Sequence, residues 1–124
     1  MSDKRLLVID DEPDIGDFIR AVAEGQDFEV CVAAKASAFI KALDDFKPTA
    51  ICLDVVMPDV DGIELLKLLA DRQCKAPILV ISGYSKLYLD SAENLAEAFG
   101  LPYVKTLAKP LSLATLRAAL KDVS

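Results

Sequence analysis

The sequence contains no histidine and no tryptophan, and the missing histidine excludes several kinds of site. Without it the chain cannot form a Ser-His-Asp or Cys-His triad, nor the usual zinc sites that use histidine ligands. A phosphohistidine is excluded as well. Any phosphorylation of this protein must therefore use another type of residue.

Long apolar runs are also absent. No stretch approaches the ~20 residues that a membrane-spanning helix requires. The N-terminal Met-Ser-Asp-Lys-Arg is followed by a short apolar run that ends at Asp10, and this pattern is too short for a signal peptide. We therefore expect a cytoplasmic protein without a membrane partner.

Basic residues are outnumbered, with 14 Lys and Arg against 20 Asp and Glu, which gives a net charge of −6. Proteins that bind DNA or RNA present a basic surface to the phosphates, so a nucleic-acid partner is disfavoured. Most of the acidic residues are expected on a solvated surface. Some of them could instead cluster around a cation.

Cysteine is scarce. The chain has three cysteines, which is an odd number, and no two of them have Cys-x-x-Cys spacing. Cys31, Cys52 and Cys74 lie in or beside apolar segments. We expect buried, reduced thiols at these positions rather than a metal site or a disulfide.

Short apolar runs alternate with helical patterns along the whole chain. The runs predict strands over residues 6–9, 28–32, 50–53, 78–81 and 104–108. Helical spacing of apolar residues predicts helices from 13 to about 22, over 36–46, from 62 to about 69, from 86 to 99 and over 113–120. The expected fold is α/β, a doubly wound parallel sheet of five strands with the flavodoxin-like (βα)5 order. With 124 residues and no linker, we expect one domain over residues 1–124.

Polar or charged residues stand at the carboxyl ends of four of the five expected strands. They are Asp10-Asp11, Asp54, Ser82 and Lys109. Doubly wound sheets bind ligands at this edge. We therefore expect these side chains to form one site.

Three carboxylates so close together repel one another unless a cation lies between them. Oxygen ligands suit Mg²⁺, which typically takes one or two carboxylates together with waters and phosphate oxygens. Lys109 adds a positive charge for a phosphate, and Ser82 adds a hydroxyl group. A carboxylate nucleophile, a divalent cation and an ammonium group are the requirements for phosphoryl transfer to an aspartate.

Each feature taken alone has a structural alternative. Asp10-Asp11 could cap a helix, because aspartate is favoured at helix N-termini. The segment after Asp54 could be a turn, and so could the Ser82-Gly83 dipeptide. Lys109-Pro110 alone indicates almost nothing. Their joint position at the strand ends favours the functional interpretation.

The same positions carry a resemblance to a known family. The motifs are Val8-Ile9-Asp10-Asp11-Glu12-Pro13, Leu53-Asp54-Val55-Val56-Met57-Pro58-Asp59-Val60-Asp61-Gly62, Ile81-Ser82-Gly83 and Ala108-Lys109-Pro110. In order and spacing the whole chain resembles the receiver domain of two-component response regulators, and we expect no output domain. The resemblance implies that the protein accepts a phosphoryl group and is not itself an enzyme.

Site roles follow from this resemblance, position by position. Asp54 matches the phosphoacceptor. Asp11 and Asp54 match carboxylate ligands of Mg²⁺, with Asp10 acting through the water shell of the metal and Val56 contributing its backbone carbonyl. The switch hydroxyl and its ammonium partner correspond to Ser82 and Lys109. In the family the peptide bond between this lysine and Pro110 is usually cis.

Three positions bear on how the switch would work. Thr106 occupies the position of the family's switch aromatic, so the usual coupling between that ring and Ser82 is in doubt. Val56 and Tyr84 occupy positions that tune the lifetime of the phosphoryl group. Because both side chains could hinder an attacking water, we expect slow self-dephosphorylation. Gly83 would leave the pocket open to a donor.

The resemblance also implies partners. A histidine kinase or a histidine phosphotransfer protein would dock on the first helix, where Ile15, Phe18 and Ile19 are candidate contacts. The output face would include the fourth helix, whose Leu87, Tyr88 and Leu89 cannot all face inward. The protein would be a monomer or a phosphorylation-dependent homodimer that binds an unidentified target protein or passes the phosphoryl group along a relay.

Two other functions stay open at this point. An aspartyl-phosphate phosphohydrolase uses a similar sheet edge, but it normally has an acid where this chain has Val56. A phosphorylation-independent docking module usually lacks an acidic or lysine position, and none is missing here.

Overall fold

Strands and helices alternate along the chain, as the sequence predicts. The computed structural model describes residues 4–10, 12–54, 62–82, 86–101, 103–109 and 111–123, with the backbone alone for 62, 63, 82, 86–89 and 92. The strands are β1 (Arg5–Ile9), β2 (Glu29–Ala33), β3 (Ala50–Asp54), β4 (Ile78–Ser82) and β5 (Val104–Ala108). The helices are α1 (Pro13–Glu24), α2 (Ala36–Asp45), α3 (Gly62–Asp71), α4 (Lys86–Ala98) and α5 (Leu113–Asp122).

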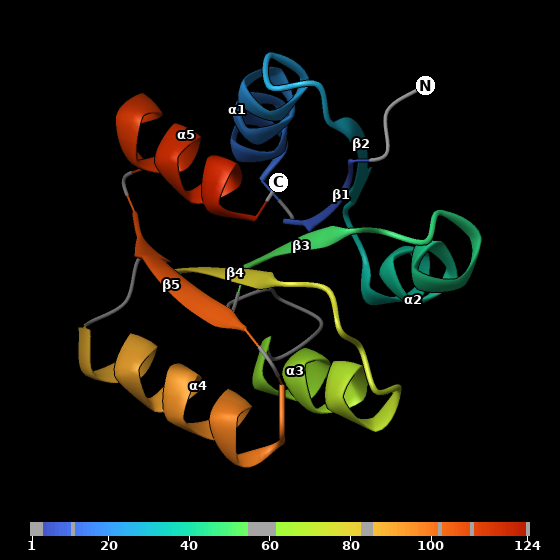
Figure 1. The fold of residues 1–124 in the computed structure, drawn as a ribbon, viewed down its shortest axis with the longest axis vertical. Helices are drawn as coiled ribbons and strands as arrows, with labels where there is room; N and C mark the ends of the chain where they lie inside the picture. Colours follow the sequence, from blue (N-terminus) through green and yellow to red (C-terminus); the bar gives the residue numbers. More distant parts are fainter. Residues whose placement is uncertain are drawn as a thin grey trace.

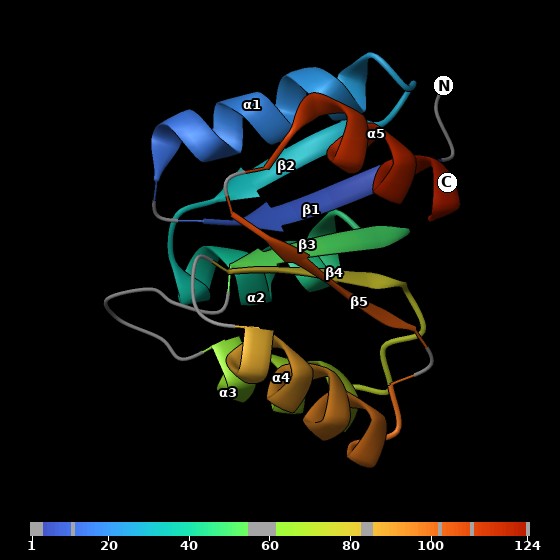
Figure 2. The same cartoon turned by 90° about the vertical axis from the view of Figure 1, so that its left-hand side faces the viewer.

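All five strands are parallel, in the order β2-β1-β3-β4-β5. This is the order of the flavodoxin-like fold, so the expected fold class is confirmed. The views in Figures 1 and 2 show helices on both faces of the sheet and strand arrows that point the same way. The carboxyl ends of the strands therefore gather at one edge.

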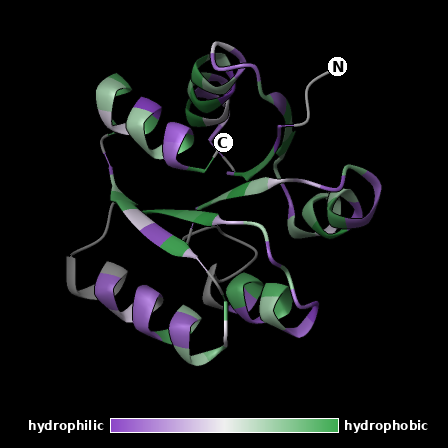
Figure 3. Cartoon of the chain, in the orientation of Figure 1, coloured by the Kyte–Doolittle hydropathy of each residue, from purple (hydrophilic) through white to green (hydrophobic). Residues whose placement is uncertain are grey.

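The two faces of the sheet bury separate cores. On one face α1 and α5 pack against the strands through buried apolar side chains such as Ile19 and Leu116, and on the other face α2, α3 and α4 do so through Phe39, Leu66 and Ala96. Because successive residues of a strand point to opposite faces, each central strand supplies both cores. This is why β1, β3 and β4 are largely apolar runs, whereas β5 carries Lys105 and Thr106 and shows a purple stretch in Figure 3, where the helices also carry both colours.

The second strand begins one residue later than predicted. Phe28 is buried, but its N–H donates to the carbonyl of Ala23 at 3.1 Å, after Asp27 has adopted a left-handed φ of 68°. Phe28 therefore completes the C-terminal cap of α1 instead of pairing in the sheet. Its apolar side chain, which made it resemble a strand residue, packs in the core beside the end of the helix.

Local signals place the helix ends. Pro13 lies in the first turn of α1, where its missing N–H costs no hydrogen bond. The Ser112 hydroxyl caps α5 by accepting the N–H of Thr115. Gly100, with a φ of 85°, follows α4 in a conformation that glycine adopts readily. Within the part of the chain that the structure describes, no helix is both long and apolar enough to cross a membrane.

The three cysteines are free thiols. Cys52 is buried in β3 as predicted, and burial raises the pKa of its thiol. Cys31 and Cys74 are only half-buried, which is less than the sequence indicated. Both lie at the periphery of one of the two cores.

Candidate functional site

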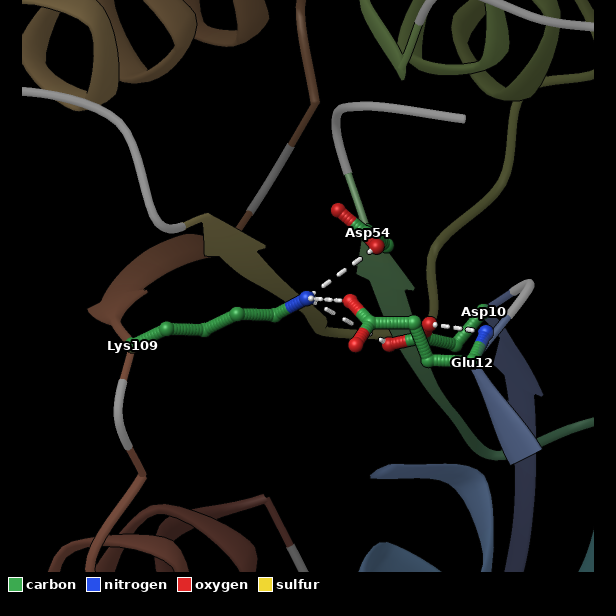
Figure 4. A network of polar contacts seen from close by, with 4 residues as sticks. All are labelled: Asp10, Glu12, Asp54 and Lys109. Atoms are coloured by element: carbon green, nitrogen blue, oxygen red, sulfur yellow. Dashed lines mark hydrogen bonds and ion pairs between the residues drawn. The ribbon is translucent and has the colours of Figure 1, made fainter. Parts of the chain in front are cut away.

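Three of the predicted site residues meet at the carboxyl edge of the sheet. Ile9 of β1 is paired with Leu53 of β3, so the next residues, Asp10 and Asp54, lie side by side. Lys109 follows β5 and reaches the same place from the other side of the site (Figure 4). The sheet register, rather than any local motif, creates this meeting of distant residues.

The ammonium group of Lys109 lies among three carboxylates. Its Nζ is 3.3 Å from Oδ2 of Asp54, 3.0 Å from Oε1 of Glu12 and 3.9 Å from Oδ2 of Asp10. The first two contacts are hydrogen bonds, whereas the third is a longer ion pair. The cation thus links the strand ends of β1, β3 and β5.

Asp10 and Asp54 are the buried polar residues of the described chain, with 3% and 4% of their surface exposed. Oδ1 of Asp10 accepts the backbone N–H of Glu12 at 2.9 Å. Oδ2 of Asp10 has no hydrogen-bond partner among the described residues. A buried carboxylate oxygen without a donor is costly, so this atom indicates a place for a cation or a bound water.

The environment shifts two pKa values in the site. Burial, together with the neighbouring charge of Asp54, raises the pKa of Asp10 to about 6, although the N–H of Glu12 opposes this change. Burial by itself would lower the pKa of Lys109. The hydrogen bond to Glu12 and the charges of Asp54 and Asp10 outweigh burial, so that the pKa of Lys109 is raised and its ammonium form is favoured.

The donor set fits a hard divalent cation. One carboxylate oxygen from each of Asp10, Glu12 and Asp54 lies within 4.8 Å of the other two. Oxygen-only donors and an unsatisfied buried oxygen are typical of a site for Mg²⁺. Asp11 and Val56, which the family resemblance implies as further metal ligands, lie outside the described residues.

Other predicted positions are placed only in part. Ser82 is the last residue of β4 and is paired with Ala108, next to Lys109, but its side chain is outside the description, as are Gly83, Tyr84 and Pro110. Thr106 lies half-buried in the middle of β5, and its hydroxyl donates to Oε2 of Glu93 in α4 at 3.3 Å. Thr106, which stands where the family has its switch aromatic, therefore links β5 to α4 through a hydrogen bond.

Glu12 is the site residue that sequence reasoning missed. It is the N-cap of α1 and makes no side-chain capping bond, because its carboxylate turns to Lys109 instead. Nor does Asp10 cap the helix in the usual way, since its Oδ1 binds the N–H of the N-cap residue itself. The signal available in the sequence was a third acid immediately after Asp10-Asp11 and before Pro13.

The residues that the sequence analysis names as candidate contacts for an upstream partner lie on α1. Ile19 is fully buried in the core, while Ile15 and Phe18 are half-buried and pack at its edge. Ile19 is therefore not available as a contact, contrary to its place among the candidates. The side chains of Leu87, Tyr88 and Leu89 lie outside the described part of the chain.

Comparison with known proteins agrees with this geometry. Residues 6–121 match the family model of the response regulator receiver domain. Among solved structures, chemotaxis protein CheY4 of Vibrio cholerae superimposes with a TM-score of 0.84 at 23% identity, covering 98% of each chain. The receiver domain of a Francisella response regulator gives 0.83 at 24% identity, with 98% of this chain and 96% of that chain covered. These similarities concern the fold.

Sequence relatives point to the same family. The transcriptional regulatory protein FixJ of Bradyrhizobium diazoefficiens is 34% identical over 105 residues, which is 85% of this chain but 49% of FixJ. The chemotaxis protein CheY of Listeria monocytogenes is 29% identical over 98 residues, which is 77% of this chain and 82% of CheY. With the family model covering nearly all of the sequence, the chain belongs to the receiver domain family of two-component response regulators.

Proposed function

We propose that this protein accepts a phosphoryl group on Asp54 in a Mg²⁺-dependent reaction and signals through the phosphorylated form. Receiver domains of the CheY type are generally phosphoacceptors. The observation that supports this role most strongly is the buried Asp54 carboxylate, held 3.3 Å from Lys109 and beside the unsatisfied oxygen of Asp10.

In the proposed reaction an oxygen of Asp54 attacks the phosphorus atom of the donor. The new O–P bond forms as the bond to the donor's leaving group breaks, and the leaving group keeps that electron pair. Mg²⁺, when bound, supplies neutralisation of phosphate charge. Asp10 and Asp54 would hold it in the described part of the site, with Asp11 and the carbonyl of Val56 as further ligands, while Glu12 lies beside them and binds Lys109.

Lys109 has the second electrostatic role. Its ammonium group already lies beside Oδ2 of Asp54, where a phosphoryl oxygen would arrive after transfer. Preorganised charge of this kind lowers the barrier of phosphoryl transfer. Ser82, at the end of the neighbouring strand, would supply the switch hydroxyl.

The test is intact-mass analysis after incubation with acetyl phosphate, with and without Mg²⁺. Wild type should gain one phosphoryl group, only when Mg²⁺ is present. Asp54→Asn should gain none, while Asp17→Asn, which removes an exposed charge from α1, should label like wild type. If no adduct forms with acetyl phosphate or with a panel of histidine kinases and phosphotransfer proteins, a phosphorylation-independent docking module becomes the better function.

For the partners, we propose a histidine kinase or histidine phosphotransfer protein as the donor, docking against α1 near Ile15 and Phe18. We further propose that the protein works in the cytoplasm, as a monomer or a phosphorylation-dependent homodimer. Slow self-dephosphorylation, through Val56 and Tyr84, belongs to the same proposal.

The output surface proposed here is the face formed by α4, β5 and α5. A groove of about 620 Å³ lies on this face, lined by Asp90, Glu93, Asn94, Glu97, Leu101 and Val104. The Thr106 hydroxyl of β5 donates to Glu93 in the lining of the groove, so a movement of β5 would change the position of this side chain. The three acids in its lining, Asp90, Glu93 and Glu97, favour a target protein with basic residues. Reversing the charge of Glu97 should weaken binding of such a target.

A further inference from the structure

Glu12 has a fixed backbone and an outstretched side chain. Its N–H donates to Oδ1 of Asp10 at 2.9 Å, and its carbonyl accepts the N–H of Gly16 at 3.1 Å, in the first turn of α1. The side chain is 60% exposed, yet it extends across the site to Lys109 (Figure 4). The start of α1 therefore holds a carboxylate in place over the phosphorylation site.

Of the three carboxylates around Lys109, Glu12 is the nearest. Its Oε1 lies 3.0 Å from Nζ, compared with 3.3 Å for Asp54 and 3.9 Å for Asp10. An ammonium group has only three N–H donors. Glu12 and Asp54 take two of them, so a phosphoryl group on Asp54 could bind the cation through more than one of its strong acceptor oxygens only if one of these hydrogen bonds were given up.

We propose that Glu12 is the resting-state partner of Lys109 and competes with the incoming phosphoryl group for its ammonium, which makes Glu12 a positioning residue that restrains phosphorylation of Asp54. This inference rests on the proposed function. Glu12 acts through Lys109, and it does not touch the reacting atoms. When the Lys109 ammonium binds the phosphoryl group instead, the exposed Glu12 carboxylate would be released.

Three substitutions separate contact from charge. Glu12→Gln removes the negative charge, Glu12→Asp keeps the charge but is one methylene too short to maintain the contact, and Asp14→Asn removes a charge from the same helical turn. Asp14 is exposed, and it is not among the described ion-pair partners of Lys109. Because Glu12 is exposed at the surface, all three variants are expected to fold, and a melting curve for each checks this.

The kinetic experiment measures the rate of labelling by acetyl phosphate at saturating Mg²⁺, so that differences in metal affinity do not enter. Both Glu12 variants should be labelled roughly two- to fivefold faster than wild type, the range that an exposed ion pair is worth. Asp14→Asn should match wild type. A gain in Glu12→Gln alone would overturn the proposal, since it would show an effect of charge on the anionic donor. An unchanged or slower rate in both Glu12 variants would overturn it as well.

A second readout does not depend on phosphorylation. The ¹⁵Nζ resonance of Lys109 at fixed neutral pH reports the partners of the ammonium group. It should shift in Glu12→Gln and Glu12→Asp but not in Asp14→Asn, and an unshifted resonance in the Glu12 variants would overturn the pairing. If wild type takes no label at all while the resonance shifts as expected, the proposed function fails and the pairing stands.

Discussion

Replacing Asp10 with asparagine is expected to stabilise the metal-free protein, although it removes a side chain from the centre of the site. The carboxylate of Asp10 is buried, its Oδ2 lacks a hydrogen-bond partner among the described residues, and the nearest cation, Lys109, is 3.9 Å away. Asparagine has the same shape and keeps an oxygen for the N–H of Glu12. It carries no charge, so the larger penalty for burying an ion is removed.

The raised pKa of Asp10 sets the magnitude. It is about 6 in the folded protein against an ordinary value of 3.8, and each tenfold change in proton affinity is worth about 1.4 kcal/mol. The ionised form therefore costs about 3 kcal/mol of folding free energy at neutral pH. This value already includes the attraction to Lys109, but burial of the polar amide of asparagine still costs free energy, which offsets part of the gain. We expect the free energy of unfolding to rise by about 2 kcal/mol.

The sign of the pH dependence follows from the same comparison. Between about pH 4 and pH 6 the folded protein binds a proton at Asp10 that the unfolded chain has already released. The contribution of Asp10 to stability is therefore most favourable at the acidic end of this window, falls as the pH rises and is flat above it. In Asp10→Asn this decline should be absent.

Urea unfolding followed by far-ultraviolet circular dichroism suits the measurement, since the chain has no tryptophan. It should be carried out at several pH values in the presence of a chelator, which keeps the protein free of metal. Asp17→Asn, which removes an exposed charge from α1, is the matched control and should change stability by less than ~0.5 kcal/mol. An Asp10→Asn protein that is less stable than wild type at neutral pH, or that keeps the wild-type pH profile, would refute the reasoning.

Three further predictions concern the same site. Millimolar Mg²⁺ should raise the melting temperature of wild type by several degrees and have a much smaller effect on Asp10→Asn, because a ligand that binds only the folded state stabilises it; equal shifts in both proteins in a thermal melt would contradict the assignment of the metal site. Lys109→Gln should bind Mg²⁺ several-fold more tightly in calorimetry, because the metal ion no longer competes with the Lys109 ammonium group for the carboxylates around it; weaker binding would show that Lys109 organises the ligands. Val56→Asn and Tyr84→Ala should each shorten the half-life of the phosphorylated protein several-fold by giving water better access; a half-life that neither substitution shortens would count against slow self-dephosphorylation.

Much of the fold was predictable because its main signals are local. Strands buried on both faces are continuous apolar runs, and the helices between them have apolar residues at helical spacing, so the element order and the parallel sheet follow from the sequence. The start of β2 was the exception. Phe28 is as apolar as a strand residue, and only the bond from its N–H to Ala23 shows that it belongs to the end of α1.

The site was predictable where strand ends determine it and not where side-chain reach does. Asp10, Asp54 and Lys109 meet because the register brings their strand ends together, which the topology implies. Glu12 joins them because a helix start holds its backbone while its side chain extends across the site to Lys109. The hydrogen bond from Thr106 to Glu93 likewise depends on how α4 packs against β5, which residue spacing does not encode.

The most direct test of the central claim is to locate the phosphoryl group. An acyl phosphate is reduced by borohydride to an alcohol, so trapping after labelling in Mg²⁺ converts a phosphorylated aspartate to homoserine, which peptide mass spectrometry assigns to one position. We expect homoserine at position 54 in wild type and in Asp17→Asn, and none without Mg²⁺. Homoserine at another aspartate, or a stable phosphate on a hydroxyl side chain with Asp54 intact, would contradict it.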